Sequence, residues 1–339
     1  MNITKLLYFL QKNATFFIIL HFKLIINMSR TLRILFFCII LSASSTVFAQ
    51  KHIEKKEEDS VRIQRKIQYS QGACLGKKKE KPLYFDLYEP TTETQAYRPL
   101  VITLFGGGFV VGSRDYADMK VWCYRLAKQG YVAASIDYRL LSVGRISGSN
   151  LIRAGYLATL DLLSAIHYFK IHCDQYHIDT NRIFLLGQSA GATTILHALY
   201  MDEEERPPET KEPIMLPSLS SAKKESGNVA GAIILWGSIL NPAIIDSNAC
   251  TPICLIHGMH DKILPIGEGK AFQVKKFPYV YGSQTIANHL SKIGQTNFEY
   301  HQFDNEKHAF YFKYLYLFRL IPNKFDSCFQ IAEKFMENR

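Results

Sequence analysis

A serine lies in the pentapeptide Gly187-Gln188-Ser189-Ala190-Gly191, between the apolar stretch 183–186 and a segment expected to be helical. The bare G-x-S-x-G pattern should arise by chance in roughly one chain in ten of this length, but a position between a strand and a helix is what a sharp nucleophile turn requires. The glycines leave room for a tight turn that presents the hydroxyl above the sheet. Ser189 is therefore the candidate nucleophile.

Two groups with complementary chemistry follow this serine along the chain. Asp261 comes after the apolar stretch 253–256, and His308 comes after the stretch 298–303. Because the carboxyl ends of parallel strands meet at one edge of a sheet, we expect these side chains to converge on Ser189. An imidazole can take the serine proton, and a carboxylate can orient the imidazole. The sequence therefore predicts a triad of Ser189, His308 and Asp261.

Other side chains compete for the roles of base and acid. The rival bases are His260, His289 and His301, and the rival acids are Asp246, Asp304 and Glu306. His301 falls within an expected strand and His289 within an expected helix, where a packed or solvated histidine is the ordinary role. Asp304 and Glu306 are so near His308 in sequence that a charged loop explains them.

Three consecutive glycines, at 106–108, follow the apolar stretch 100–105. Attack on an ester carbonyl builds negative charge on its oxygen, and losing one backbone donor for that charge costs about 3–4 kcal/mol. Glycines let the backbone approach the oxygen without an intervening Cβ. We predict an oxyanion hole from the amides of Gly107, Gly108 and Ala190. A phosphate loop is not expected, because no Lys-Ser or Lys-Thr follows.

The elements that must position these groups alternate between strands and helices. Expected strands are 83–88, 100–105, 131–136, 183–186, 229–236, 253–256 and 298–303, and expected helices are 121–129, 157–169, 190–200, 286–293 and 331–336. This alternation predicts an α/β fold with a mostly parallel central sheet and helices on both faces. Residues 202–228 break the rhythm with an acidic, proline-containing part and a part rich in Ser and Lys. We expect a surface insertion there.

The N-terminal region is typical of an export signal. Starting at Met28, Arg30 and Arg33 precede the apolar core 34–41, and small residues stand at the −3 and −1 positions before Gln50. The core is much shorter than the about 20 residues of a membrane span. We expect a signal within 1–49, cleavage after Ala49, and a periplasmic or secreted protein with no stable membrane span.

The remaining chain is expected to divide into two parts. Residues 50–82 form a charged N-terminal segment, loosely ordered as far as Ile67, and residues 83–339 form the catalytic domain. The formal charge is +10, but the first 49 residues hold five basic and no acidic residues, which leaves a net charge of +5. No basic face with interleaved aromatic residues is visible, so we expect no nucleic-acid partner.

Cysteines and other ligand types give no cofactor signal. Cys250 and Cys254 are the only close pair, and they lack His or Cys partners at metal-ligand spacing. Cys254 lies in an apolar run, where we expect it to be packed. No metal or organic cofactor is implied.

These motifs together resemble the α/β-hydrolase esterases and lipases of the hormone-sensitive-lipase and type-B carboxylesterase groups. The similar segments are the oxyanion loop 105–113, the D-Y-R-L segment 137–140, the D-x-x-R-I segment 178–183, the H-G-x-x-D acid loop 257–261 and, as in exported bacterial esterases, 270–283. Phe105 stands where most members carry histidine, although cholinesterase-like members also use an aromatic residue there. The resemblance runs from about residue 83 to the end and implies an α/β-hydrolase fold.

The favoured function is hydrolysis of a small-molecule or polysaccharide-linked carboxylic ester through an acyl-Ser189 intermediate. Phe105, Phe109 and Trp236 are expected to line the substrate pocket. One alternative is a serine peptidase of the prolyl-oligopeptidase type, although those enzymes generally use a tyrosine donor where this chain has three glycines. The other is a non-catalytic binding protein on a hydrolase scaffold, although such relatives usually lack a triad member.

Overall fold

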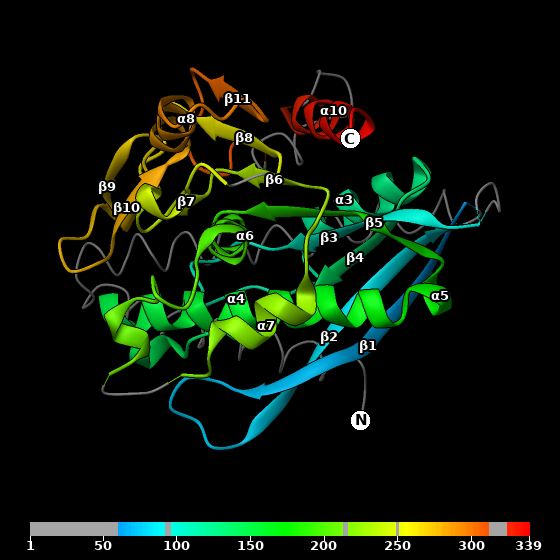
Figure 1. Ribbon diagram of the computed structural model, residues 1–339, viewed down its shortest axis with the longest axis horizontal. Coiled ribbons are helices and arrows are strands. Elements are labelled where there is room, and N and C mark those ends of the chain that lie inside the picture. Colours follow the sequence, from blue (N-terminus) through cyan, green and yellow to red (C-terminus); the bar gives the residue numbers. More distant parts are fainter. Residues whose placement is uncertain (1–59, 92–95, 213–215, 249–250, 312–323) are drawn as a thin grey trace, which may run out of the picture. The chain divides into compact units, whose positions relative to one another are not determined.

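A computed structural model describes residues 60–91, 96–212, 216–248, 251–311 and 324–339 (Figure 1). The chain divides into two units, Met1–Phe48 and Ala49–Arg339, and all described residues belong to the second. The predicted export signal lies outside the described residues. Within the described ranges, no helix is long and apolar enough to cross a membrane.

An eight-stranded sheet forms the centre of the fold, in the order β1-β2-β4-β3-β5-β6-β8-β11. The strands are β1 (Val61–Ala73), β2 (Glu80–Pro90), β3 (Arg98–Leu104), β4 (Val132–Ile136), β5 (Ile178–Gln188), β6 (Gly231–Leu235), β8 (Ile253–Gly258) and β11 (Phe298–Phe303). β2 pairs antiparallel with β1 and with β4, and the other neighbours are parallel. The predicted mostly parallel sheet is confirmed.

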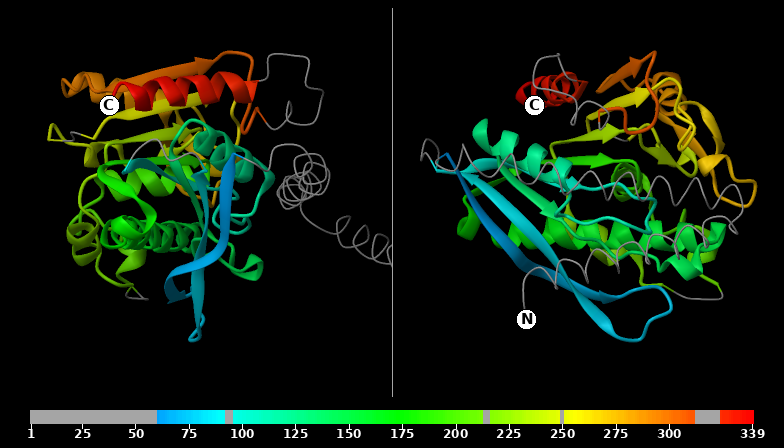
Figure 2. Two further views of the ribbon diagram at one scale, coloured as in Figure 1. Left: turned by 90° about the vertical axis from the view of Figure 1, so that its right-hand side faces the viewer. Right: turned by 180° about the vertical axis from the view of Figure 1, so that it is seen from behind.

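Helices cover both sides of this sheet (Figure 2). They are α3 (Ala117–Lys128), α4 (Gly148–Ile171), α5 (Cys173–Tyr176), α6 (Ala190–Tyr200), α7 (Leu219–Ser226), α8 (Ser283–Lys292) and α10 (Lys324–Glu337). Strands β3, β4, β6 and β8 are buried along their whole length, which explains their continuous apolar sequences. Trp122 of α3 packs on Phe325 and Phe329 of α10, with ring centroids 4.9 and 5.4 Å away.

A second, three-stranded sheet has the order β7-β10-β9, from β7 (Ser238–Ile239), β10 (Tyr279–Gly282) and β9 (Glu268–Lys270). A small apolar cluster of Leu264, Ala271 and Val280 accompanies it. This sheet comes from the segments that flank β8, and it contributes to the pocket beside Ser189 described below.

The N-terminal part of the described chain differs from the sequence expectation. Val61–Ile67, expected to be loosely ordered, lie in β1, and the sheet begins well before residue 83. Most β1 side chains are exposed, and the alternation of apolar and polar residues in β1 is interrupted by Arg65 and Lys66, where the register with β2 shifts. Its hydrogen bonds to β2 fix its conformation, and those bonds leave no trace in the sequence of β1.

The predicted surface insertion at 202–228 is more ordered than expected, because it contains α7 and the short 3₁₀ helix Pro208–Thr210. Arg206 is buried and donates hydrogen bonds of 3.0 Å to the carbonyl oxygens of Thr210 and Leu216. Its guanidinium lies 4.8 Å from the centre of the Tyr156 ring in α4. One buried cation therefore fastens this insertion to the fold.

The register of the parallel strands aligns their carboxyl ends. Partner residues near those ends are Leu104 with Gly187, Gln188 with Leu235, Leu235 with Ile256, and Gly258 with Phe303. The glycine loop 106–108 leaves β3 at this edge, and Ser189 leaves β5. Asp261 and His308 follow β8 and β11. All the sequence-predicted chemical groups therefore emerge from one edge of the sheet.

Candidate active site

Ser189 occupies a strained turn between β5 and α6. Its φ of 53° and ψ of −118° lie outside the helical and extended regions. A Cβ on Gly187 would lie 2.6 Å from the backbone of Gly191, and a Cβ on Gly191 would lie 2.4 Å from the oxygen of Leu104. Both positions therefore require glycine, and the turn holds the serine at the start of α6. Such strain persists only where the surroundings enforce it.

His308 joins the serine to the aspartate. Its Nε2 lies 2.9 Å from Ser189 Oγ, and its Nδ1 lies 2.6 Å from Asp261 Oδ2. The Asp261 side chain is fully buried, while 16% of the His308 side chain is exposed. The structure therefore brings together the three residues that the sequence singled out, in the order required for proton transfer from a hydroxyl.

Asp261 is surrounded by donors. Its Oδ1 accepts backbone hydrogen bonds from Ile263 at 2.8 Å and Leu264 at 3.0 Å. Burial alone would raise the pKa of Asp261, but the charge of His308 and hydrogen bonds from His257 and His308 lower it below its ordinary value. The carboxyl is therefore ionised in the folded protein at neutral pH.

His257 is a further polar residue of the site, and no role was assigned to it from the sequence. It is fully buried, with Nε2 3.1 Å from Asp261 Oδ2 and 3.0 Å from the Leu264 carbonyl oxygen. Its Nδ1 lies 2.8 Å from the Ser283 hydroxyl. The H-G-x-x-D segment contains this histidine four residues before the acid, but only the fold shows that the two side chains meet.

Backbone contacts hold the acid loop against the histidine loop. The amide of Met259 donates to the oxygen of Phe303, and the amide of His260 donates to the oxygen of Glu306. A Cβ on Gly258 would lie 2.7 Å from the carbonyl oxygens of Glu306 and Lys307. The end of β8 can approach the residues before His308 because position 258 lacks a side chain.

The glycine loop lies directly beside the serine. A Cβ on Gly106 would lie 3.1 Å from the Cβ of Ser189. Gly107 has a φ of +130°, and its carbonyl oxygen accepts hydrogen bonds of 3.1 Å from Val110 and Val111. A Cβ on Gly107 would lie 1.9 Å from the oxygen of Val111, so only glycine fits this turn. The glycine loop therefore lies against the candidate nucleophile, and Ala190 follows that serine as the first residue of α6.

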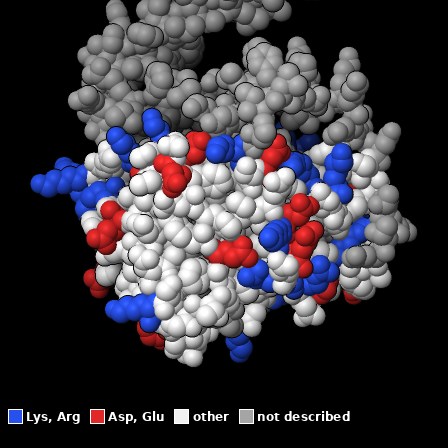
Figure 3. All heavy atoms as spheres, turned by 90° about the horizontal axis from the view of Figure 1, so that it is seen from above, with Lys and Arg blue, Asp and Glu red and all other residues white. Residues whose placement is uncertain are grey.

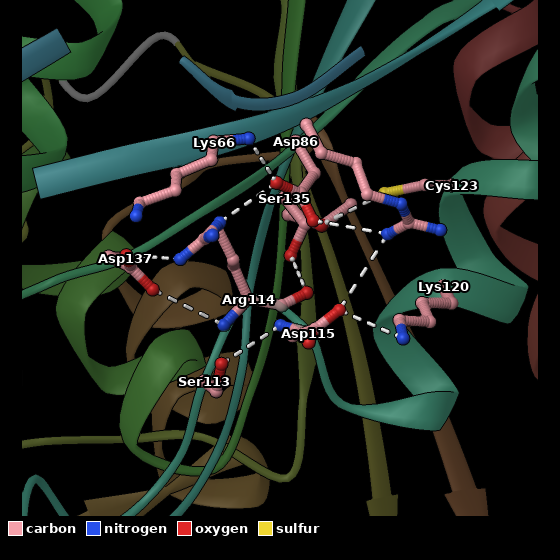
Figure 4. A network of polar contacts seen from close by, with 11 residues as sticks. Lys66, Asp86, Ser113, Arg114, Asp115, Lys120, Cys123, Ser135 and Asp137 are labelled. Carbon is pink, nitrogen blue, oxygen red and sulfur yellow. Dashed lines mark hydrogen bonds and ion pairs between the residues drawn. The ribbon is translucent and has the colours of Figure 1, made fainter. Parts of the chain in front are cut away.

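A partly buried ion-pair network anchors the far end of this loop (Figure 4). Arg114 Nη1 lies 2.6 Å from Asp137, which follows β4, and Arg114 Nε lies 2.9 Å from Asp86 in β2. The carbonyl oxygen of Arg114 accepts a hydrogen bond of 2.9 Å from Ser135, and Asp86 also accepts one of 2.8 Å from the amide of Lys66 in β1. These contacts give Asp137 of the D-Y-R-L segment a structural role.

Phe105 does not line the pocket beside Ser189, which corrects the sequence expectation. Only 1% of it is exposed, and its ring stacks on Tyr138 with a centroid separation of 4.2 Å. The Tyr138 hydroxyl donates a hydrogen bond of 2.8 Å to the Phe105 carbonyl oxygen. Phe105 therefore braces the start of the glycine loop from behind.

Trp236 is also absent from the pocket wall, contrary to expectation. It is fully buried behind His308, with ring centroids 6.3 Å apart, and it packs on Phe310 and Tyr311. It directly follows β6, which lies beside β8 in the sheet. Its ring therefore supports the His308 imidazole from the interior of the protein. The position of Trp236 just after a strand does not reveal whether its side chain faces the pocket or the protein interior.

Phe109 does line the pocket, together with residues of α4, α6 and the segments around the small sheet. The wall comprises Gly108, Phe109, Leu151, Ile152, Gly155, Tyr156, Ser189, Ala190, Thr193, His197, Met201, Pro207, Ser238, Leu240, Leu264, Ala271, Phe272, Pro278 and Val280. The pocket has a volume of about 70 Å³. The wall is mainly apolar, so this cavity suits a short hydrocarbon chain.

His197 contributes a neutral imidazole to this wall. Burial lowers the pKa of His197 to about 4. Its Nε2 accepts a hydrogen bond of 3.3 Å from the amide of Leu240. Because Nε2 already accepts this hydrogen bond and burial disfavours the protonated ring, His197 is poorly suited to act as a second base for Ser189.

The rival bases and acids have other partners. His289 Nε2 lies 2.8 Å from the Ile245 carbonyl oxygen, and His301 Nε2 lies 3.2 Å from the Glu299 carboxylate. Asp304 accepts a hydrogen bond of 2.7 Å from a neighbouring glutamine. None of these three side chains contacts the Ser189 hydroxyl.

The surface in Figure 3 carries basic and acidic side chains intermixed. Within the described part of the chain, that face shows no uniformly basic area of the kind that attracts a phosphate backbone.

Known proteins resemble this chain in both sequence and structure. The family model described as BD-FAE matches residues 85–235, a stretch that contains the glycine loop and Ser189 but ends before Asp261. Gut esterase 1 of Caenorhabditis elegans is 29% identical over 97 residues, which are 29% of this chain and 17% of that protein. Fumonisin B1 esterase of Sphingopyxis macrogoltabida is 27% identical over 133 residues, which are 37% and 24% of the two chains.

The matched stretches thus span about a fifth of the length of these curated relatives. Among solved structures, Thermogutta terrifontis esterase 2 phosphorylated by paraoxon aligns with a TM-score of 0.56 and 19% identity, covering 83% of this chain and 95% of that one. The propionate-bound form of that esterase aligns with a TM-score of 0.55 and 20% identity, covering 83% and 94%. The shared arrangement is the α/β-hydrolase fold.

Proposed function

We propose that this α/β-hydrolase, which is related in sequence to esterases of the carboxylesterase type, hydrolyses carboxylic esters through an acyl-Ser189 intermediate. The observation that carries the proposal is the position of His308, with one ring nitrogen 2.9 Å from the serine hydroxyl and the other 2.6 Å from Asp261. A hydroxyl, a base and an orienting carboxylate in this geometry are the groups needed for acyl transfer.

The first half of the reaction acylates the serine. Ser189 Oγ attacks the ester carbonyl carbon while its proton moves to His308 Nε2. The tetrahedral intermediate then breaks the bond to the alcohol oxygen, which leaves with the proton held by His308. In the second half, a water molecule gives its proton to His308 and attacks the acyl carbon. The carboxylic acid departs, and Ser189 regains its proton.

Asp261 acts as an ionised orienting group throughout the cycle. Its pKa is lowered, so the carboxylate accepts the hydrogen bond from His308 Nδ1 and stabilises the imidazolium that forms on proton transfer. The backbone donors at Ile263 and Leu264 fix the other carboxylate oxygen. This environment keeps the imidazole in the tautomer that presents a free lone pair to Ser189.

Gly107, Gly108 and Ala190 supply the oxyanion donors in this proposal. Support comes from the contact of the glycine loop with Ser189 and from the place of Ala190 as the first residue of α6. The N-terminus of a helix carries a partial positive charge, which favours the developing oxyanion. Each such donor contributes about 3–4 kcal/mol to the transition state.

The substrate carries a short acyl or alkoxy group beside Ser189, on either a small molecule or a polysaccharide. The apolar cavity of about 70 Å³ supports this size limit. The esterase from Thermogutta terrifontis, which shares the fold, has been solved with propionate bound. A large acyl group would need a rearrangement of Phe109 or Phe272.

A fluorophosphonate probe tests the mechanism directly. The wild-type protein should become covalently labelled, and Ser189→Ala should abolish both labelling and nitrophenyl ester hydrolysis, with a rate loss on the order of 10⁴-fold or more. Ser164→Ala is the matched control, because its hydroxyl bonds only to the helix backbone at Leu160. An unchanged rate in Ser189→Ala would remove the mechanism. Cleavage of proline-containing peptides in place of all esters would favour a peptidase.

We also propose that the protein is exported. The support is the pattern of basic residues, apolar core and small residues that ends at Ala49. Sequencing the N-terminus of the protein recovered from a bacterial periplasm should give Gln50 as the first residue. Recovery of an unprocessed chain from the cytoplasm would contradict this.

A further inference from the structure

Three potential metal ligands meet on the two strands at the far edge of the sheet. Cys254 lies in β8, and Glu299 and His301 lie in β11. Glu299 is the register partner of Cys254, and His301 is two residues further along, so all three side chains project from the same face. Their ligand atoms all lie within 4.8 Å of one another.

The donor set has the chemistry of a zinc site. A thiolate sulfur, an imidazole nitrogen and a carboxylate oxygen are the usual ligands of Zn²⁺, and the bond lengths of about 2.0–2.3 Å place tetrahedral ligand atoms roughly 3.3–3.8 Å apart. We propose that Cys254, Glu299 and His301 bind a zinc-class divalent cation, with a fourth position left for water. This site is separate from the proposed esterase centre and does not depend on it.

The side chains can close on an ion by small movements. About a third of the Glu299 and His301 side chains is exposed (34% and 35%), which leaves them free to turn, whereas Cys254 is buried in its strand. His301 Nε2 now lies 3.2 Å from Glu299 Oε2, and an ion would take the place of that contact. The other oxygen, Oε1, lies 3.5 Å from Arg339 Nη1. That ion pair would remain and orient the ligating carboxylate.

Binding requires loss of the thiol proton. Burial raises the pKa of the Cys254 thiol, and the charge of Glu299 raises it further, so the free thiol is protonated at neutral pH. Metal binding forms a sulfur–metal bond and releases this proton to solvent. The titratable or charged groups that face Cys254 are Glu299 and His301 from β11, Cys328 from α10, and Arg339 just after that helix.

The consequence would be a clamp on the edge strand. β11 pairs with β8 alone in the sheet, and its carboxyl end leads into the loop that carries His308. An ion shared by β8 and β11 binds the folded state only, so it should raise the melting temperature. The clamp lies before the strand's carboxyl end, so the ion would take no part in the chemistry at Ser189.

Cobalt is the probe for this site, because thiolate-to-Co²⁺ charge transfer absorbs in the near ultraviolet and reports a bond to cysteine. The metal-free full chain titrated with Co²⁺ should develop this band at one equivalent, and Zn²⁺ should displace it. Cys254→Ala should lose the band, and both Cys254→Ala and His301→Gln should weaken Zn²⁺ binding by on the order of 100-fold or more. Cys328→Ala, which removes a neighbouring buried thiol, is the matched control and should keep the band.

Two results would overturn the proposal. One is the absence of the band in wild-type protein at a large excess of cobalt. The other is a band that persists in Cys254→Ala. If Cys254→Ala does not fold, the His301→Gln variant, which changes a partly exposed side chain, tests the proposal instead. Its zinc affinity is measured by competition with a coloured chelator, and an unchanged affinity would overturn the proposal. The cobalt band and the zinc affinity are both measured by absorbance and need no esterase activity. Ser189→Ala should therefore show the same band and the same zinc affinity as the wild type. A failure of the esterase proposal would not affect this test.

Discussion

The side chain of Gln188 accepts a hydrogen bond of 2.5 Å from the hydroxyl of Tyr311. Gln188 immediately precedes the candidate nucleophile, and Tyr311 lies three residues after the candidate base. Both side chains are buried, and Trp122 Nε1 donates a hydrogen bond of 3.1 Å to the same hydroxyl. Gln188 Nε2 in turn donates to Asp118 at the start of α3. One buried contact thus ties the segment that carries Ser189 to the segment that carries His308.

Tyr311→Phe should therefore weaken both stability and catalysis. The variant leaves the Gln188 oxygen and the Trp122 N–H without their shared partner, which costs about 1–3 kcal/mol of unfolding free energy. We expect kcat to fall several-fold with little change in KM, because the contact positions Ser189 relative to His308 and does not touch substrate. Urea unfolding and steady-state kinetics measure the two effects. Tyr300→Phe is the control, because it removes a partly exposed hydroxyl and should change neither stability nor kcat. An unchanged kcat in Tyr311→Phe would refute the positioning role.

Asp118 should make stability depend on pH. Burial raises the pKa of Asp118 from 3.8 to about 6, so the folded protein holds this proton more tightly than the unfolded chain. Its contribution to stability is fully present below about pH 4 and is lost as pH rises through about 6. A change from 3.8 to about 6 corresponds to about 3 kcal/mol. Asp118→Asn should lack this decline in urea unfolding across the same pH range, and parallel profiles for the two proteins would contradict the assignment.

Asp261→Asn should reduce kcat/KM by on the order of 10⁴-fold, because an amide cannot stabilise the imidazolium and favours the wrong tautomer. Since the pKa of Asp261 is lowered, its protonation should not shape the pH–rate profile near neutrality. Ester hydrolysis by variant and wild type over that pH range checks both statements. Asp304→Asn, at the rival acid on the surface, should retain wild-type rates. A comparable loss in Asp304→Asn would mean that the acid has been misassigned.

His257 should act by positioning Asp261. His257→Leu removes the side chain that contacts both the carboxylate and the Ser283 hydroxyl, so stability should fall by about 1–3 kcal/mol and kcat should drop more than KM changes. His257→Gln keeps a donor at a similar reach and should recover part of kcat. The two variants are compared by kinetics and thermal melting. Equal kcat losses in Leu and Gln, at equal stability, would show that donation to Asp261 is not what matters.

Phe109 should set the chain-length preference. Its ring lines the cavity beside Ser189, and a Cβ on Gly155 would lie 3.3 Å from that ring. Phe109→Ala should raise kcat/KM for nitrophenyl hexanoate and octanoate relative to acetate, while Gly155→Ala should press the ring inward and lower it. Phe105→Leu is the control, because Phe105 packs on Tyr138 outside the pocket and its variant should leave the chain-length preference unchanged. A chain-length preference that changes in Phe105→Leu but not in Phe109→Ala would contradict the assignment of this pocket to the substrate.

The nucleophile turn and the glycine loop could be predicted from the sequence because their requirements are local. Gly187 and Gly191 are imposed by backbone atoms less than 3 Å from where a Cβ would lie, and Gly107 by a φ that side chains rarely adopt. Such constraints require glycine at fixed positions in the chain, where it can be recognised in the sequence. The alternation of strands and helices is likewise written in short-range patterns, which predicted the mostly parallel sheet.

Tertiary structure alone decided which side chains face one another. The convergence of His308 and Asp261 could be expected because both follow parallel strands, but the register that places Glu299 beside Cys254 does not follow from spacing along the chain. The inward packing of Phe105 and Trp236 depends on neighbours from other strands, and β1 is ordered by hydrogen bonds to β2. Backbone requirements at single residues are legible in sequence, whereas contacts between distant segments exist only after the sheet has fixed their relative positions.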